Sequence, residues 1–168
     1  MQAALGGLIQ FMDVPMSSFS AGPPVQPPMK VDGQRVAVSV CYEDAFGEQI
    51  IRALPAATVL ANVSDDAWFG HYIAPRQHLT IARMRALETG RPLLRATNTG
   101  VTAIIGAHGR VQAEAPPFQV AALTGEIQPR RGMTPYARTG NAPVVILIVV
   151  MLAAGGFFAW RCGAVGKG

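Results

Sequence analysis

One cysteine in this sequence occupies a position where a nucleophile could act. Cys41 ends the alternating apolar segment RVAVSVC at residues 35–41, and a segment of helical composition follows it. A strand that passes through a tight turn into a helix leaves the sulfur near unpaired backbone N–H groups, which favour a thiolate. The structural alternative is that a lone cysteine at the end of an apolar strand is a small buried hydrophobe. Local sequence leaves both interpretations open.

Two neighbours of Cys41 carry groups that acyl chemistry uses. If the backbone stays extended, Glu43 lies on the same side as Cys41, so its carboxylate could orient a basic group or hold a substrate amine. A negative charge in the first turn of a helix explains Glu43 equally well. Tyr42 is expected to offer its backbone N–H to a developing oxyanion.

Other polar residues have simpler interpretations. Asp65 and Asp66 have no His, Cys or carboxylate partners at metal-ligand spacing, so the sequence predicts a solvated loop and no metal. His78 is expected to cap or pack within a helix. The net charge is +4, but the basic residues are scattered rather than clustered among aromatic residues, which argues against nucleic acid. We expect free thiols at both cysteines, Cys41 and Cys162, and no cofactor.

The elements around Cys41 follow an α/β pattern. The first strand leads into a helix at residues 45–54, and Pro75 and Gly90 begin and end a second helix. An extended loop is expected at residues 1–28. Alternation and short apolar runs predict the remaining strands, which lie at residues 58–63, 93–97, 101–105 and 111–115.

The last part of the chain has a different composition. Residues 144–160, VVILIVVMLAAGGFFAW, carry no charge, whereas a buried soluble helix of that length normally shows a polar stripe. Crossing a bilayer takes roughly 17 to 25 apolar residues, so we predict a transmembrane helix at residues 142–161 and a short tail at 162–168. Arg161 and Lys167 follow the apolar run and favour a cytoplasmic tail with the globular part outside.

Together these motifs resemble a known family. The segment RVAVSVCYED, followed by GEQ, is similar to the nucleophile segment of the nitrilase, or carbon–nitrogen hydrolase, superfamily. SDDAWFG, QH at residues 77–78, ARMRALETGRPLLRATNTGVTAIIGAHG and TPYARTGN are together similar to apolipoprotein N-acyltransferases. The resemblance implies that residues 1–140 are the carboxyl-terminal part of an α-β-β-α sandwich. It also implies a Glu-Lys-Cys triad with Cys41 as the nucleophile.

The resemblance further implies a two-step transfer without a cofactor, on the periplasmic side of the bacterial inner membrane. Cys41 would take a fatty acyl group from a phospholipid as a thioester and pass it to the α-amino group of a diacylglyceryl-modified apolipoprotein cysteine. Trp68 and Phe69 would lie at the lipid interface as part of the substrate mouth. A packed surface loop is the alternative for these two residues.

The sequence also departs from the family pattern. The family's triad glutamate and lysine lie upstream of the cysteine, beyond Met1, and its amino-terminal membrane domain also lies upstream. Lys30 stands only eleven residues before Cys41 and is not the triad lysine. We therefore expect a carboxyl-terminal fragment that is inactive alone. The alternatives are a non-catalytic membrane-anchored remnant and a nitrilase-like amidase; the terminal anchor and TPYARTGN argue against the amidase.

Overall fold

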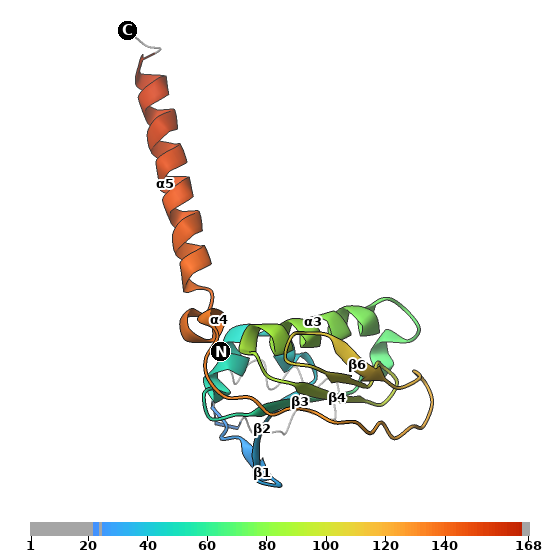
Figure 1. Cartoon of the computed structure of the whole chain (residues 1–168). Helices are drawn as coiled ribbons and strands as arrows, with labels where there is room; N and C mark the ends of the chain where they lie inside the picture. Colours follow the sequence, from blue (N-terminus) through green and yellow to red (C-terminus); the bar gives the residue numbers. More distant parts are fainter. Residues whose placement is uncertain (1–21, 24, 166–168) are drawn as a thin grey trace, which may run out of the picture.

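The computed structural model describes residues 22–23 and 25–165, and for residues 158–165 it describes the backbone only. Within that part of the chain, six strands form one sheet in the order of the sequence (Figure 1). The strands are β1 (Met29–Val31), β2 (Gln34–Val40), β3 (Val59–Ser64), β4 (Leu93–Thr97), β5 (Ala103–Ile105) and β6 (Val111–Glu114).

The centre of the sheet is parallel and its margins are antiparallel. β2, β3 and β4 run in the same direction, whereas β1 pairs antiparallel with β2, and β5 and β6 continue antiparallel from β4. Parallel neighbours need a crossover, and α3 (Ala74–Thr89) provides it between β3 and β4 along one face of the sheet (Figure 1). The carboxyl ends of β2, β3 and β4 therefore meet at one edge.

The core lies between this parallel centre and α3. Alternate residues of the strands point toward the helix, so Leu60 and Leu93 are buried against it. Burying a leucine side chain contributes about 1.5–3 kcal/mol, which makes these contacts a main source of stability. The other buried members of the cluster come from α3, from β5 and from the loop before β5: Leu79, Ala82, Ala86, Val101, Ala103 and Ile105.

The opposite face of the parallel centre is apolar and exposed. Val38, Val40, Val63 and Leu94 are 43%, 56%, 44% and 37% exposed. The register pairs Val40 with Val63, so these side chains form a continuous patch, which we call the apolar band. Among the described residues no layer covers the apolar band.

The sequence predicted most elements to within two residues, but not the segment after Cys41. In place of a helix at residues 45–54 the chain forms three short turns: η1 (Cys41–Ala45), α2 (Gly47–Ile50) and η2 (Ile51–Ala53). Gly47 at the start of α2 packs closely, because a Cβ there would collide with Nη1 of Arg85. β1 was also missed, although Asp32 and Gly33 both have positive φ and form the kind of two-residue hairpin turn that Asp-Gly favours.

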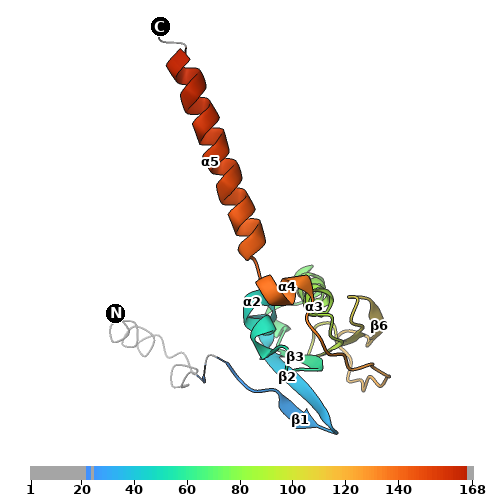
Figure 2. The same cartoon turned by 60° about the vertical axis from the view of Figure 1, so that its left-hand side comes forward.

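A single long helix, α5 (Ala142–Val165), projects away from the sheet (Figures 1 and 2). Its backbone runs past the predicted boundary at residue 161. Its described side chains, such as Ile146, Val150 and Leu152, are apolar and more than half exposed. Among the residues that the structure describes, no helix is both long and apolar enough to cross a membrane. The transmembrane helix stays a prediction. Three parts of the predictions lie outside the described residues: the environment of Cys162, residues 166–168, and most of the loop predicted at residues 1–28.

The base of α5 is tied to the sheet domain by short polar contacts. α4 (Pro135–Thr139) precedes it, and the Thr134 side chain caps α4 by accepting from Ala137 N at 3.0 Å while donating to the Glu88 carbonyl on α3. Asn141 N donates to Oε1 of Glu48 on α2 at 3.1 Å, which places a carboxylate at the amino end of α5, where it is favourable. Only Gly140 and Asn141 separate α4 from α5.

Candidate active site

Cys41 lies where β2 ends and η1 begins, at the edge formed by the carboxyl ends of the parallel strands. Its backbone has a φ of 50°, in the left-handed region, and its side chain is half-buried. For a residue other than glycine this conformation costs roughly 1–2 kcal/mol, so surrounding contacts must hold it. A partly accessible cysteine at a strand-to-turn junction is compatible with a nucleophile, and that role stays a prediction.

Glu43 closes the turn that carries Cys41. Its Oε2 accepts the backbone N–H of Val40 at 2.7 Å, and its carbonyl accepts the N–H of Phe46 at 3.1 Å. The condition of extended backbone at Glu43 is not met, because Cys41–Ala45 is a 3-10 turn. The Glu43 carboxylate therefore points back to the strand end. Its proposed role toward a base or an amine stays a prediction.

Tyr42 lies on the outside of the same turn. Its side chain is 60% exposed, and its ring packs edge-on against Phe46 with centroids 5.7 Å apart. The Tyr42 ring is thus separate from the buried polar side chains behind Cys41. The role that we expect of Tyr42 belongs to its backbone N–H and stays a prediction.

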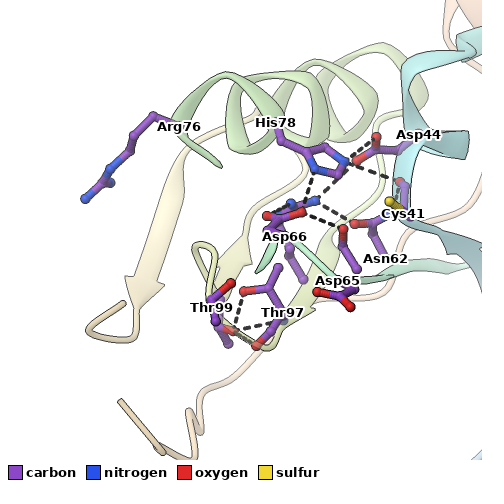
Figure 3. A network of polar contacts seen from close by, with 12 residues as sticks. Cys41, Asp44, Asn62, Asp65, Asp66, Arg76, His78, Thr97 and Thr99 are labelled. Atoms are coloured by element: carbon purple, nitrogen blue, oxygen red, sulfur yellow. Dashed lines mark hydrogen bonds and ion pairs between the residues drawn. The ribbon is translucent and has the colours of Figure 1, made fainter. Parts of the chain in front are cut away.

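Behind Cys41 lies a set of buried polar side chains that contact its backbone (Figure 3). Nδ2 of Asn62 donates to the Cys41 carbonyl oxygen at 3.1 Å, and Nε2 of His78 lies 3.3 Å from the same oxygen. Asn62 comes from β3 and is fully buried; His78 comes from the first turns of α3 and is 5% exposed. Two elements remote in sequence therefore converge on the residue that bears the thiol.

His78 belongs to a buried quartet of charged residues with Asp44, Asp66 and Arg95. Figure 3 shows the His78 ring between Asp44 and Asp66. Its Nδ1 lies 3.0 Å from Oδ1 of Asp66, and its Nε2 lies 3.1 Å from Oδ1 of Asp44. Arg95 binds Oδ2 of Asp66 at 2.9 Å and lies 3.5 Å from Oδ2 of Asp44. Both imidazole nitrogens face carboxylate oxygens, so a doubly protonated ring can donate to both Asp44 and Asp66. Two cations and two anions then balance.

The surroundings of His78 act on its pKa in opposite directions. Burial is the largest single influence and lowers the pKa, whereas the hydrogen bond to Asp44 raises it. The positive charge of Arg95 lowers it further, and the negative charges of Asp44 and Asp66 raise it. The net effect is a pKa above the ordinary value of histidine, which favours the imidazolium form.

The sequence interpretation of Asp66 as a solvated loop residue is wrong. Asp66 is fully buried, and its Oδ1 accepts from Ser64 at 2.7 Å in addition to its two ionic contacts. Gly100 leaves the room for it, since a Cβ there would lie 2.1 Å from Oδ2 of Asp66. His78 lies in α3 as predicted, but its side chain contacts Asp44 of η1 and Asp66 of the loop after β3 rather than capping or packing within its own helix. The contacts of Asp44, Asn62 and Arg95 were missed, although Asn62 and Arg95 stand at inward positions of apolar strands, where a polar residue needs a partner.

Asp65 behaves as the sequence predicted. It is exposed, and the backbone N–H of Ala67 at 2.9 Å, followed by the side chain of Asn98 at 2.6 Å, lowers its pKa. No group of three or more His, Cys, Asp or Glu side chains suited to a metal ion occurs among the described residues.

Trp68 and Phe69 lie in η3 (Ala67–Phe69), which follows β3 at the same edge of the sheet as Cys41. Trp68 is 88% exposed and Phe69 is 38% exposed. Tyr72 and Ile73 extend the same loop and are 83% and 70% exposed. The alternative of a packed surface loop does not describe Trp68, because its indole ring is almost fully accessible. Whether Trp68 and Phe69 contact substrate stays a prediction.

Comparison with known proteins agrees with this architecture. A family model described as carbon–nitrogen hydrolase matches residues 11–136. The solved structure of a carbon–nitrogen hydrolase from Helicobacter pylori G27 superposes with a TM-score of 0.52 at 21% identity, over 59% of this chain and 42% of that one. This likeness shows the fold.

Sequence similarity is stronger to one group of proteins. The chain is 52% identical over 160 residues to the apolipoprotein N-acyltransferase of Nitrosomonas europaea, covering 95% of this chain and 32% of that protein. It is 53% identical over 151 residues to the apolipoprotein N-acyltransferase of Ralstonia nicotianae, covering 87% and 29%. The chain thus spans about a third of the length of the curated relatives it matches. It belongs to the carbon–nitrogen hydrolase family and, within that family, is similar to proteins named apolipoprotein N-acyltransferase.

Proposed function

We propose that this chain is the nucleophile-bearing part of an apolipoprotein N-acyltransferase and that Cys41 carries the acyl group. The observation that carries the proposal is the similarity over 95% of the chain to proteins of that name. The strained position of Cys41 at the end of β2 supports its assignment as the nucleophile. The proposed reaction is the transfer of a fatty acyl group from a phospholipid to the α-amino group of a diacylglyceryl-modified apolipoprotein cysteine.

The first step forms an acyl-enzyme. A general base takes the proton of the Cys41 thiol, and the thiolate attacks an ester carbonyl of the phospholipid. A C–S bond forms, the C–O bond breaks, and the lysophospholipid alcohol leaves with the proton that the base returns. The negative charge on the carbonyl oxygen during this step needs hydrogen-bond donors, and the backbone N–H of Tyr42 is one that we propose.

The second step transfers the acyl group to the amine. The α-amino group attacks the thioester carbonyl, a C–N bond forms, the C–S bond breaks, and the thiolate of Cys41 is restored. The amine gives up its proton to a general base. Glu43 is proposed to support this step by holding the amine or orienting the basic group.

His78 is not proposed as the base. Both of its ring nitrogens are engaged with Asp44, Asp66 and the Cys41 carbonyl, and the ring is buried. An imidazolium with both N–H groups occupied cannot accept a proton from the thiol. We propose instead that the glutamate and lysine of a Glu-Lys-Cys triad come from a longer protein that contains this sequence, as the coverage of its relatives suggests.

The same longer protein would complete the fold. We propose an α-β-β-α sandwich in which a second sheet covers the apolar band, formed by Val38, Val40, Val63 and Leu94. Residues 1–168 alone would then lack both this cover and the base. We propose that residues 1–168 are inactive without the rest of the longer protein.

We propose that α5 anchors the protein in the bacterial inner membrane with the sheet domain on the periplasmic side. The uncharged run at residues 144–160 and the exposed apolar side chains of α5 support this placement. Trp68 and Phe69 are proposed to meet the lipid interface, where exposed aromatic rings are common, and to form part of the substrate mouth.

Acyl labelling tests the assignment of Cys41. The complete protein containing this sequence is incubated with a labelled phospholipid, and the adduct is mapped by mass spectrometry. We expect a hydroxylamine-sensitive adduct on Cys41 that disappears in Cys41→Ala. Cys162→Ala removes the other cysteine and is the matched control. An adduct that persists in Cys41→Ala and vanishes in Cys162→Ala would overturn the assignment.

A further inference from the structure

The carbonyl oxygen of Cys41 has two buried donors on different elements. Nδ2 of Asn62 on β3 lies 3.1 Å from it, and Nε2 of His78 on α3 lies 3.3 Å from it. We call these two side chains the carbonyl clamp. The contact is to the backbone of Cys41, so the carbonyl clamp acts on the turn that carries the thiol.

Asn62 has one orientation that fits its neighbours. Its Oδ1 accepts from Nη1 of Arg95 at 2.6 Å, and a guanidinium only donates. The other end of the amide must therefore be the NH₂ group, which donates to Oγ of Ser39 at 3.1 Å and to the Cys41 carbonyl. Arg95 thus fixes the direction in which Asn62 donates.

His78 is fixed in the same way from its other ring nitrogen. Asp66 holds Nδ1 at 3.0 Å, and Asp44 shares Nε2 with the Cys41 carbonyl. The charged groups that face His78 come from η1, from the loop after β3 and from β4; they are Asp44, Asp66 and Arg95. Because each ring nitrogen of His78 faces a carboxylate, the buried ring cannot rotate without breaking an ion pair.

We propose that the carbonyl clamp, held by the buried quartet, keeps Cys41 in its left-handed conformation and so positions the thiol for acyl transfer. With the carbonyl of Cys41 held on the buried side of the turn, the peptide between Cys41 and Tyr42 has a fixed plane. The N–H of Tyr42 and the sulfur of Cys41 then keep a constant relation to each other. The inference rests on the proposed function, because it names the residues that prepare the same nucleophile.

Asn62 and His78 are positioning residues. They touch the backbone of Cys41 and lie buried behind it, so they do not meet the substrate. Displacement of a reacting group by about 1 Å can reduce a rate by about 100-fold, so loss of the carbonyl clamp has a measurable consequence.

Three variants separate positioning from folding. Asn62→Asp keeps an acceptor for Arg95 and removes the amide donor, leaving a carboxylate oxygen against the Cys41 carbonyl. His78→Ala removes the second donor, whereas His78→Gln retains an amide N–H near the place of Nε2. His108→Ala, at an exposed histidine outside the quartet, is the matched control.

Two rates are measured for each variant of the complete protein in detergent. The first is the rate at which iodoacetamide alkylates Cys41, followed by mass spectrometry with Cys162 as the internal reference. The second is the rate of acyl-thioester formation from a phospholipid. We expect both rates at Cys41 to fall about 10- to 100-fold in Asn62→Asp and His78→Ala, to recover at least partly in His78→Gln, and to stay unchanged in His108→Ala.

A purely structural role gives a different result. Melting temperatures of Asn62→Asp and His78→Ala would then fall while both Cys41 rates per folded molecule matched those of His108→Ala, and the inference would be overturned. If His78→Ala does not fold, the two Cys41 rates of Asn62→Asp and His78→Gln are compared with those of His108→Ala instead. The alkylation assay needs no acyl transfer, so it also separates the two proposals. Wild-type protein that forms no thioester contradicts the proposed function, whereas an unchanged alkylation rate contradicts the inference.

Discussion

Replacing Asp66 by asparagine tests whether the buried quartet holds the site together. Asp66 is fully buried and contacts both cations, His78 Nδ1 at 3.0 Å and Arg95 Nη2 at 2.9 Å. Asparagine has nearly the same shape but no charge, so Asp66→Asn leaves two buried cations facing one carboxylate, that of Asp44. Removing one partner from a buried ion pair costs about 3–5 kcal/mol.

The size of the effect makes the measurement decisive. For a domain of 150–250 residues, 1 kcal/mol corresponds to a shift in melting temperature of about 2–4 °C, so Asp66→Asn is expected to lower the Tm by roughly 6–20 °C. The Tm is measured by intrinsic fluorescence of the detergent-solubilised complete protein at pH 6. Asp65→Asn is the matched control, because Asp65 is adjacent in sequence and exposed. Its shift is expected to be much smaller. Equal shifts for the two variants would refute the reasoning, because they would show that the quartet adds no more to stability than a surface carboxylate.

Three further predictions concern pH, topology and activity. Because the folded-state pKa of His78 lies above the ordinary value of roughly 6.5, the stability due to its charge is fully present below pH 6.5 and is lost as pH rises through the folded-state pKa. The Tm advantage of wild type over His78→Gln should therefore shrink between pH 6 and pH 9, and a constant gap would contradict the assignment. A reporter enzyme that is active only in the periplasm should be silent when fused after Gly168, whereas strong activity would reverse the proposed topology. Residues 1–168 alone should not restore lipoprotein acylation in cells depleted of their own acyltransferase; rescue that depends on Cys41 would show that this chain supplies its own base.

Local rules were sufficient for most of the elements. Proline at the first turn and glycine after the last turn predicted α3 to within one residue, because each restricts the backbone in a known way. Alternating apolar residues predicted β2 and placed Cys41 at its end. The Asp-Gly turn before β2 carried an equally strong signal, which marks the β1–β2 hairpin.

The site itself depended on information that local rules do not carry. His78 meets Asp44 across 34 residues of sequence and Asp66 across 12, and Arg95 meets Asp66 across 29. Only the parallel pairing of β2, β3 and β4 brings these residues to one edge of the sheet. The nucleophile role that the sequence predicted for Cys41 stays a prediction, whereas Asp66 was wrongly predicted to be solvated, because a loop aspartate and a buried one look alike until their partners are placed.

The ties at the base of α5 have a mechanical consequence. Only Gly140 and Asn141 link α4 to α5, and the Asn141 N–H donates a hydrogen bond to Glu48, which stands seven residues after Cys41. A helix of 24 residues is about 36 Å long, so a tilt of about 5° moves its far end by about 3 Å. The Asn141–Glu48 hydrogen bond joins the base of α5 to α2, the segment that follows the Cys41 turn, and Thr134 joins the start of α4 to α3. A change in the direction of α5 is therefore expected to act first on the segment next to Cys41.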